Sequence, residues 1–321
     1  MQDYKNYDRY IVFFSGGKDS LASLLYLLLI GVPKEKIEIW HHLVDGKSEG
    51  FMDWPHAAGY CRAVAKHFGI PIYFSWKKGG FKRELERSNE KSLPTYFETP
   101  ATLIVAGGNR GKGLTRGLFP ALGDINRGRW CSAILKICVA KTAIVNQERF
   151  NNSRTLVISG ERAEESTARA KYQELEPHES DCRNSPNLRR HVDRWRPIHK
   201  WSEQQVWSII QLYKINPSPA YRAGFGRLSC AFCIFGNKNQ FASARKAMPE
   251  RFEAIANKER KSGQTIKPPN SKGTKTSISA IADAGTPYPG LTSKIIKELT
   301  DPDWDLQIFT IVLQLINGNC R

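Results

Sequence analysis

The stretch YIVFF-SGGKDS-LASLLYLLLI, residues 10–30, decides the fold of this chain. Residues 10–14 are apolar, aromatic or β-branched, which predicts a buried strand of a parallel sheet. Residues 21–30 are rich in leucine and precede Gly31 and Pro33, which predicts a helix. A strand that enters a helix through a glycine-rich turn forms an anion site, because the first amides of the helix have no internal partners.

The side chains of the turn suit a bound phosphate. Two glycines let the backbone approach a phosphate closely. Two serines can donate hydroxyl hydrogen bonds, the lysine adds a positive charge, and the aspartate can hold Mg²⁺ or cap the helix. The spacing of a Walker A loop is absent. The residues that we expect at the phosphates are Ser15, Gly16, Gly17, Lys18, Asp19 and Ser20.

The composition favours a polyanionic partner. The chain has 321 residues and a formal net charge of +17, which favours nucleic acid near the protein, although general solubility is an alternative explanation. No segment reaches the ~20 apolar residues of a membrane-spanning helix. Residues 1–10 show no apolar signal-peptide core. We therefore expect a cytoplasmic protein without a membrane partner.

Strands alternate with helices along the first two thirds of the chain, which predicts an α/β fold with a doubly wound parallel sheet. We expect a nucleotide-binding domain over residues 1–214 and a smaller, mostly helical region over residues 215–321. The expected strands are 10–14, 37–44, 70–76, 154–159 and 195–198; the expected helices are 21–30, 55–68, 129–145, one starting at 201, 240–261 and 303–316.

Two stretches are less regular. Residues 77–128 are rich in lysine, arginine and glycine and predict a mobile basic loop over the site, a nucleic-acid contact or a plain surface loop. Residues 262–290 have the composition of a flexible segment.

The end of the second expected strand carries His41, His42 and Asp45. These side chains line the nucleotide pocket or terminate the strand, with metal ligation as the alternative.

Residues 15–20 match the SGG-x-DS loop of the N-type ATP pyrophosphatases, and four later blocks resemble the phosphoadenosine phosphosulfate (PAPS) reductase-like branch of that superfamily. These blocks are residues 129–136, 160–169, 196–207 and 216–233. The resemblance implies a Rossmann-like fold of the adenine nucleotide α-hydrolase type, with ATP and Mg²⁺ at the loop. It also implies that the phosphates lie near Gly160, Arg162, Ser166 and Arg169, with Lys18, Asp19, Arg162 and Arg169 as catalytic residues. The alternative role for both arginines is ion pairing with Glu161, Glu164 and Glu165.

Within that branch, the chain is most similar to the Dnd/Ssp-type ATP pyrophosphatases of DNA phosphorothioation. This similarity implies adenylation of a DNA backbone for sulfur incorporation, with a cysteine desulfurase or other sulfur donor and further modification-system subunits as partners. The alternative is a sulfonucleotide reductase, but the tail NGNCR, residues 317–321, lacks the Glu-Cys-Gly-[Ile/Leu]-His segment of those enzymes. A tRNA-thiolation enzyme and a nucleotide-binding scaffold subunit also remain open.

Seven cysteines, an odd number, argue against a disulfide framework. Cys230 and Cys233 form a Cys-x-x-Cys pair, and Cys131 is a third candidate ligand. Cys138 follows Cys131 by two helical turns, or about 11 Å, and Cys182 is its rival. Four thiolates bind a [4Fe–4S] cluster or Zn²⁺, and the resemblance favours the cluster. A reduced cysteine pair without a metal is the alternative.

Overall fold

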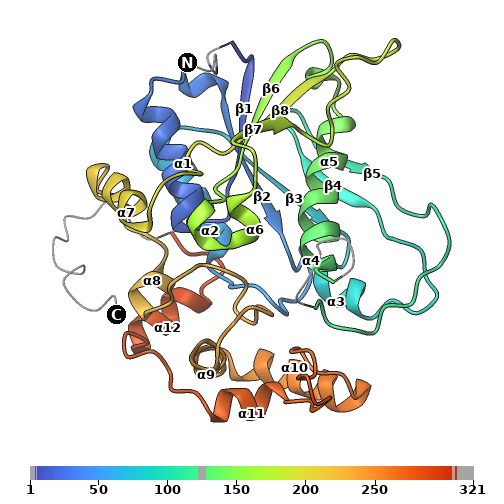
Figure 1. Ribbon diagram of the computed structural model, residues 1–321, viewed down its shortest axis with the longest axis vertical. Helices are drawn as coiled ribbons and strands as arrows, with labels where there is room; N and C mark the ends of the chain where they lie inside the picture. The colour runs from blue at the N-terminus through green and yellow to red at the C-terminus, as the bar shows by residue number, and fades with distance from the viewer. Residues whose placement is uncertain (1–3, 5, 122–127, 306–307, 309–321) are drawn as a thin grey trace.

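The computed structural model describes residues 4, 6–121, 128–305 and 308, so Cys320 and most of the predicted helix 303–316 lie outside the described residues. One eight-stranded sheet crosses the molecule in the order β5-β4-β3-β2-β1-β6-β8-β7 (Figure 1). The parallel strands are β1 (Arg9–Phe13), β2 (Ile37–Leu43), β3 (Ile72–Lys77), β6 (Arg154–Ile158) and β8 (His191–Trp195); the antiparallel strands are β4 (Thr95–Glu98), β5 (Leu103–Ala106) and β7 (Leu175–Pro177).

Both faces of the central strands are buried. Tyr10 and Val12 of β1 belong to a core that includes residues of α1 (Lys18–Leu29), α2 (Ala57–Phe68) and α7 (Glu203–Leu212). Ile11, on the opposite face, joins a second cluster with residues of α5 (Cys138–Val145). A strand covered on both faces is apolar throughout, as β1 is. The doubly wound α/β fold predicted from the sequence is therefore confirmed.

Two predicted elements differ from the structure. The expected strand at residues 195–198 is β8, which ends at Trp195; Arg196 then bonds to the carbonyl of Glu174, and Pro197 has no amide for a ladder. The expected helix 240–261 is two helices, α9 (Lys238–Ala247) and α10 (Pro249–Ser262). Pro249 starts a new helix because it cannot donate the hydrogen bond that would continue the first one.

Three unpredicted elements lie in residues 77–128. This stretch forms α3 (Gly80–Leu85) and the hairpin of β4 and β5, which extends the sheet at one edge. The helix expected at 129–145 is present as α4 (Trp130–Ser132), a π-helical turn and α5. A short helix, α6 (Thr167–Ala170), follows β6.

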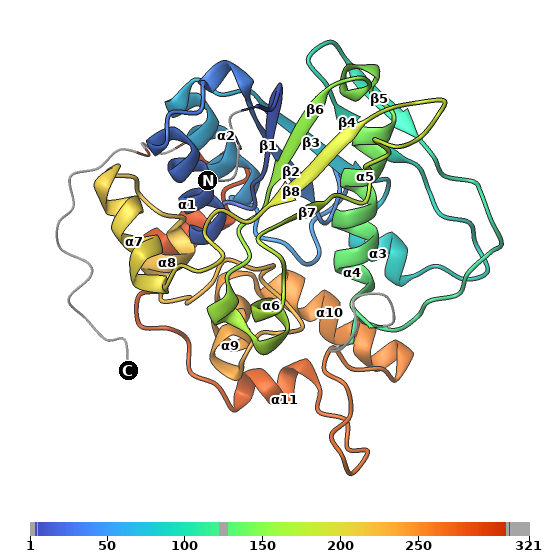
Figure 2. The same ribbon diagram turned by 45° about the horizontal axis from the view of Figure 1, so that its top comes forward.

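The C-terminal region contains α8 (Pro219–Ala223), α9, α10, α11 (Ile278–Asp283) and α12 (Ser293–Thr300). Helices α9, α10 and α11 lie together below the sheet in both views (Figure 2). Their core also includes Phe51, Leu85 and Leu135 from the N-terminal part of the chain. Helix α11 lies inside the segment predicted to be flexible, where Ile278 is buried and its amide donates to Glu259. Within the described residues, no helix combines the length and apolarity needed to cross a bilayer.

Candidate functional site

The turn between β1 and α1 has the backbone that its sequence predicts. Gly16 has a φ of +78°, a conformation that side chains disfavour. The Ser20 hydroxyl donates to the Gly17 carbonyl at 2.9 Å, and the Gly17 amide makes a long contact of 3.4 Å to the Ser15 hydroxyl. Among the described residues, the amides of Asp19 and Ser20 have no hydrogen-bond acceptor. These two donors are therefore available to an anion.

Gly160 brings the end of β6 against this turn. A Cβ atom at position 160 would lie 2.9 Å from the carbonyl carbon and oxygen of Asp19 and 3.0 Å from the Ser20 nitrogen, so only glycine fits. From β1 the chain proceeds to β2 and β3 on one side, and later returns to β6 and β8 on the other. The turn thus lies at the point where the strand order reverses, which is where open α/β sheets bind ligands.

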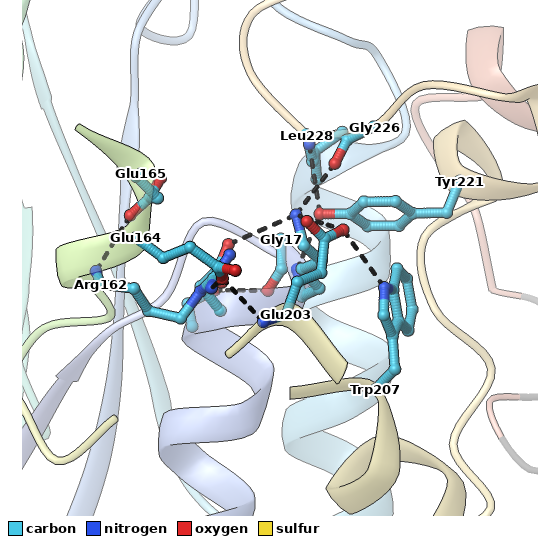
Figure 3. A network of polar contacts seen from close by, with 12 residues as sticks. Gly17, Arg162, Glu164, Glu165, Glu203, Trp207, Tyr221, Gly226 and Leu228 are labelled. Carbon is cyan, nitrogen blue, oxygen red and sulfur yellow. Dashed lines mark hydrogen bonds and ion pairs between the residues drawn. The ribbon is translucent and has the colours of Figure 1, made fainter. Parts of the chain in front are cut away.

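A network of opposite charges surrounds the turn (Figure 3). The Nε atom of Arg162 donates to Oδ1 of Asp19 at 2.6 Å, and its guanidinium also pairs with Glu164. The Arg162 hydrogen bond lowers the pKa of Glu164. The Lys18 ammonium is buried; it donates to the Gly226 carbonyl at 2.9 Å and lies 3.6 Å from Glu203. The side chains named so far are three carboxylates and two cations; Figure 3 also draws Glu165, which accepts from the Arg162 amide at 3.0 Å.

Tyr221 contacts the first amide of α1. Its hydroxyl oxygen accepts from the amide of Lys18 at 2.8 Å and from the amide of Leu228 at 3.2 Å. The Trp207 indole lies edge-on to the Tyr221 ring at 5.2 Å and donates to Glu203 at 3.3 Å. Figure 3 shows Tyr221, Gly226 and Leu228 on one side of the network and Arg162 on the other.

Sequence reasoning did not name Tyr221 or Glu203 as site residues. Tyr221 lies in one of the blocks that carried the family resemblance, which was the available signal. Glu203 follows Ser202, the N-cap of α7, and looked like an ordinary acidic residue of a first helical turn.

The second predicted arginine lies in a short helix beyond Arg162. Arg169 pairs with Glu165, and its amide donates to the hydroxyl of Ser166, which caps α6. The carboxylate pairs expected as the alternative role are thus present for both Arg162 and Arg169. A phosphate contact by Arg169 or Ser166 stays a prediction.

Asp45 braces a turn of the chain. Its Oδ2 atom accepts from the amides of Phe51, Met52 and Asp53, each at 2.8 Å, while Oδ1 is buried without a partner among the described residues. Burial raises the pKa of this carboxyl. These bonds explain why an aspartate follows β2, and a contact with the nucleotide stays a prediction.

The two histidines of β2 are both held in the neutral form. His41 Nδ1 lies 2.8 Å from the Phe14 carbonyl oxygen, and His42 Nδ1 lies 2.7 Å from the Ser75 hydroxyl. Desolvation lowers the pKa of His41 to about 4 and that of His42 to about 3. A place for these two rings in the nucleotide pocket stays a prediction.

Three of the four predicted metal ligands share one neighbour, the Lys136 ammonium. Cys131, Cys230 and Cys233 all raise the pKa of Lys136, against the effect of desolvation, which lowers it. Cys138 is exposed. It raises the pKa of Lys77 rather than that of Lys136, although burial lowers the pKa of Lys77 more strongly. Within the described part of the chain, no group of three or more His, Cys, Asp or Glu side chains is arranged to hold a metal ion. The described residues thus do not present a four-thiolate set, and the [4Fe–4S] cluster stays a prediction.

Known proteins resemble part of this chain in sequence. Residues 114–235 match the family model of the phosphoadenosine phosphosulfate reductase domain. The chain is 32% identical over 145 residues to an uncharacterized 37.8 kDa protein of Escherichia phage 186, which covers 45% of this chain and 40% of the phage protein. It is 28% identical over 103 residues to adenosine 5'-phosphosulfate reductase of Allochromatium vinosum, covering 32% and 34%. The chain therefore spans less than half the length of these curated relatives.

A solved structure of Candida glabrata FMN adenylyltransferase, in complex with FAD and inorganic pyrophosphate, aligns with a TM-score of 0.40 and 12% identity over 94% of this chain and 79% of that one. A likeness of this degree carries no functional argument.

The sheet, the switch-point turn and two helix-start amides that lack an acceptor among the described residues define an α/β protein with a candidate anion-binding turn. Over residues 114–235, the chain is similar to the phosphoadenosine phosphosulfate reductase domain family.

Proposed function

We propose that this protein is an ATP pyrophosphatase that adenylates the backbone of DNA for sulfur incorporation. The observation that carries the proposal is the start of α1, where the Asp19 and Ser20 amides are unpaired among the described residues and Lys18 and Arg162 lie beside them. A diphosphate is the anion that such a helix start and two cations suit.

The reaction would proceed in two displacements. An oxygen of the DNA phosphate attacks the α-phosphorus of ATP, the bond to the β-phosphate oxygen breaks, and pyrophosphate leaves. Hydrosulfide, released from a persulfide donor by a thiol reductant, then attacks the adenylated phosphorus of the DNA; the P–S bond forms, the P–O bond to AMP breaks, and AMP leaves. Lys18 and Arg162 hold and neutralise the pyrophosphate, while the amides of α1 orient it.

The charge of the network supports a nucleotide that arrives with a divalent cation. The three carboxylates Asp19, Glu164 and Glu203 outnumber the cations Lys18 and Arg162. A bare triphosphate would meet this excess of negative charge. Mg²⁺ is typically held by one or two carboxylates together with substrate phosphates, and Asp19 is the carboxylate nearest the helix start. The ion would supply charge neutralisation of the leaving group.

DNA as the second substrate is supported by charge. The chain carries a formal charge of +17, and basic residues favour a polyanion through counterion release. Binding of DNA and of tRNA at matched salt concentrations separates the DNA proposal from tRNA thiolation.

A sulfonucleotide reductase is the second candidate, favoured by the match of residues 114–235 and by the likeness to adenosine 5'-phosphosulfate reductase. One assay separates the two. The purified protein is incubated with Mg²⁺ and ATP, with and without DNA, and in parallel with adenylylsulfate or PAPS and a thiol reductant. We expect AMP and pyrophosphate from ATP. Release of sulfite from a sulfonucleotide, without pyrophosphate from ATP, would establish the reductase instead.

A nucleotide-binding scaffold subunit would bind ATP in this assay and release neither product. For such a subunit, adding a sulfur donor and the other subunits of a modification system would still give no pyrophosphate release that depends on Lys18. This outcome would reject the enzymatic proposal while leaving nucleotide binding intact.

A further inference from the structure

The Tyr221 hydroxyl has one hydrogen-bonding direction left. Its oxygen accepts two amide protons, from Lys18 at 2.8 Å and from Leu228 at 3.2 Å. A phenolic oxygen has two acceptor sites, so its own proton is the remaining hydrogen-bonding group. Among the described residues, no acceptor takes this proton. Burial raises the pKa of Tyr221, so the proton stays on the oxygen.

This hydroxyl lies at the surface of the phosphate turn. A Cβ atom on Gly17 would be 3.4 Å from the Tyr221 oxygen and 3.6 Å from Cβ of Leu228. The next two amides of α1, those of Asp19 and Ser20, are the unpaired donors described above. The start of α1 thus has three donors without a protein acceptor in the described structure: two amides and one hydroxyl.

The ring is held in place from several sides. Trp207 lies edge-on to it, with an interplanar angle of 89°. Lys18 lies 5.7 Å from the ring centroid and donates to the Gly226 carbonyl, which fixes the segment that follows α8. A donor fixed by packing and by two amides is already oriented for a ligand, so little conformational entropy is lost on binding.

We propose that Tyr221 is a phosphate-binding residue that donates its hydroxyl proton to the diphosphate held at the start of α1. This inference rests on the proposed function, because it assigns one more contact to the same diphosphate. It assigns to the C-terminal region, through α8, a direct part in nucleotide binding.

The test is the affinity of Tyr221→Phe for inorganic pyrophosphate, ATP and AMP, measured by calorimetry with Mg²⁺. Loss of a hydrogen bond to a charged group weakens binding by roughly 10- to 100-fold. We expect this loss for pyrophosphate and ATP, and a change below about twofold for AMP, which lacks the leaving diphosphate. Tyr288→Phe is the matched control. Tyr288 packs against Phe225 in the same segment, and its hydroxyl contacts Asn237 rather than the turn.

The outcomes separate the two proposals. Wild-type protein that binds no pyrophosphate would overturn both. Wild-type protein that binds it while Tyr221→Phe binds equally well or more tightly would overturn only the Tyr221 assignment, since the hydroxyl would then be neutral or would compete for the Lys18 amide. An equal loss for AMP would indicate a merely structural role and would also overturn the assignment.

A second measurement applies if Tyr221→Phe does not fold. A fluorinated tyrosine incorporated at position 221 keeps the ring and the acceptor oxygen but lowers the pKa of the hydroxyl. We expect its pyrophosphate affinity to fall with rising pH over a range where the wild-type affinity changes less, because a phenolate cannot donate. Identical pH profiles would contradict the assignment.

Discussion

The hydroxyl of Tyr221 accepts the amide proton of Lys18 at 2.8 Å, although the two residues are 203 positions apart in the chain. Lys18 returns a second contact, because its ammonium donates to the carbonyl of Gly226. The candidate site is therefore built by segments far apart in the sequence: β1 and α1 provide the turn, and the segment after α8 packs against it.

Replacement of Lys18 by methionine removes the ammonium but keeps most of the buried side chain. We expect pyrophosphate release from ATP to fall by at least about 100-fold, because a partly desolvated charge contact to a leaving phosphate is worth about 3 kcal/mol or more. Lys34→Met is the control, since Lys34 lies in an exposed turn away from the site. Unchanged turnover in Lys18→Met would remove Lys18 from the catalytic residues.

Replacement of Gly160 by alanine tests the close approach of β6 and α1. The new methyl group would lie 2.9 Å from backbone atoms of Asp19, so the backbone must move. We expect a loss of about 1–3 kcal/mol in the free energy of unfolding and a larger proportional loss of pyrophosphate affinity. Urea unfolding and calorimetry measure the two effects. A stable variant with normal affinity would show that the helix start need not be held against β6.

Buried histidines make the stability depend on pH. Desolvation lowers the pKa of His41 and that of His56 from 6.5 to about 4. Between these values the unfolded chain binds more protons than the native protein, so stability decreases as the pH falls. Each histidine costs about 2 kcal/mol between pH 7 and pH 5. Urea unfolding at the two pH values checks this, and equal stability at both would contradict it.

We expect nucleotide binding to lower the reactivity of Cys230. Leu228 packs over Gly16 and Gly17, and Cys230 follows two residues later. A ligand on the turn fixes this segment, so we expect ATP with Mg²⁺ to slow alkylation of Cys230 several-fold. Exposed Cys138 is the internal control and keeps its rate. Mass spectrometry of alkylated peptides measures both rates. An equal rate at Cys230 with and without ATP would show that the turn and the thiols are independent.

Local sequence signals predicted the strand, turn and helix over residues 10–30 and most of the sheet. An apolar run and a glycine pair determine the structure of a few neighbouring residues, so the sequence alone predicts that structure. Pro249 is also a local signal, because a proline inside the expected helix 240–261 favours a break at that position. The partners of Asp45, three amides of a turn six to eight residues later, depend on loop geometry that no periodicity reveals.

The remaining features depend on contacts between distant parts of the chain. Tyr221 meets Lys18 only because α8 folds back onto the start of α1. Cys131 and Cys138 lie two turns apart in sequence, yet the helix between them contains a π-helical turn, which changes the direction of each side chain. Sequence spacing alone therefore could not show that Lys136, and not Cys138, is the neighbour of Cys131.

The central claim is that the start of α1 binds the diphosphate of an adenine nucleotide. The most direct measurement is a crystal structure with Mg²⁺ and an ATP analogue that cannot be cleaved between the α- and β-phosphates. We expect the β- and γ-phosphates to accept hydrogen bonds from the amides of Asp19 and Ser20. An analogue bound with its phosphates elsewhere, while these amides face only water, would contradict the account.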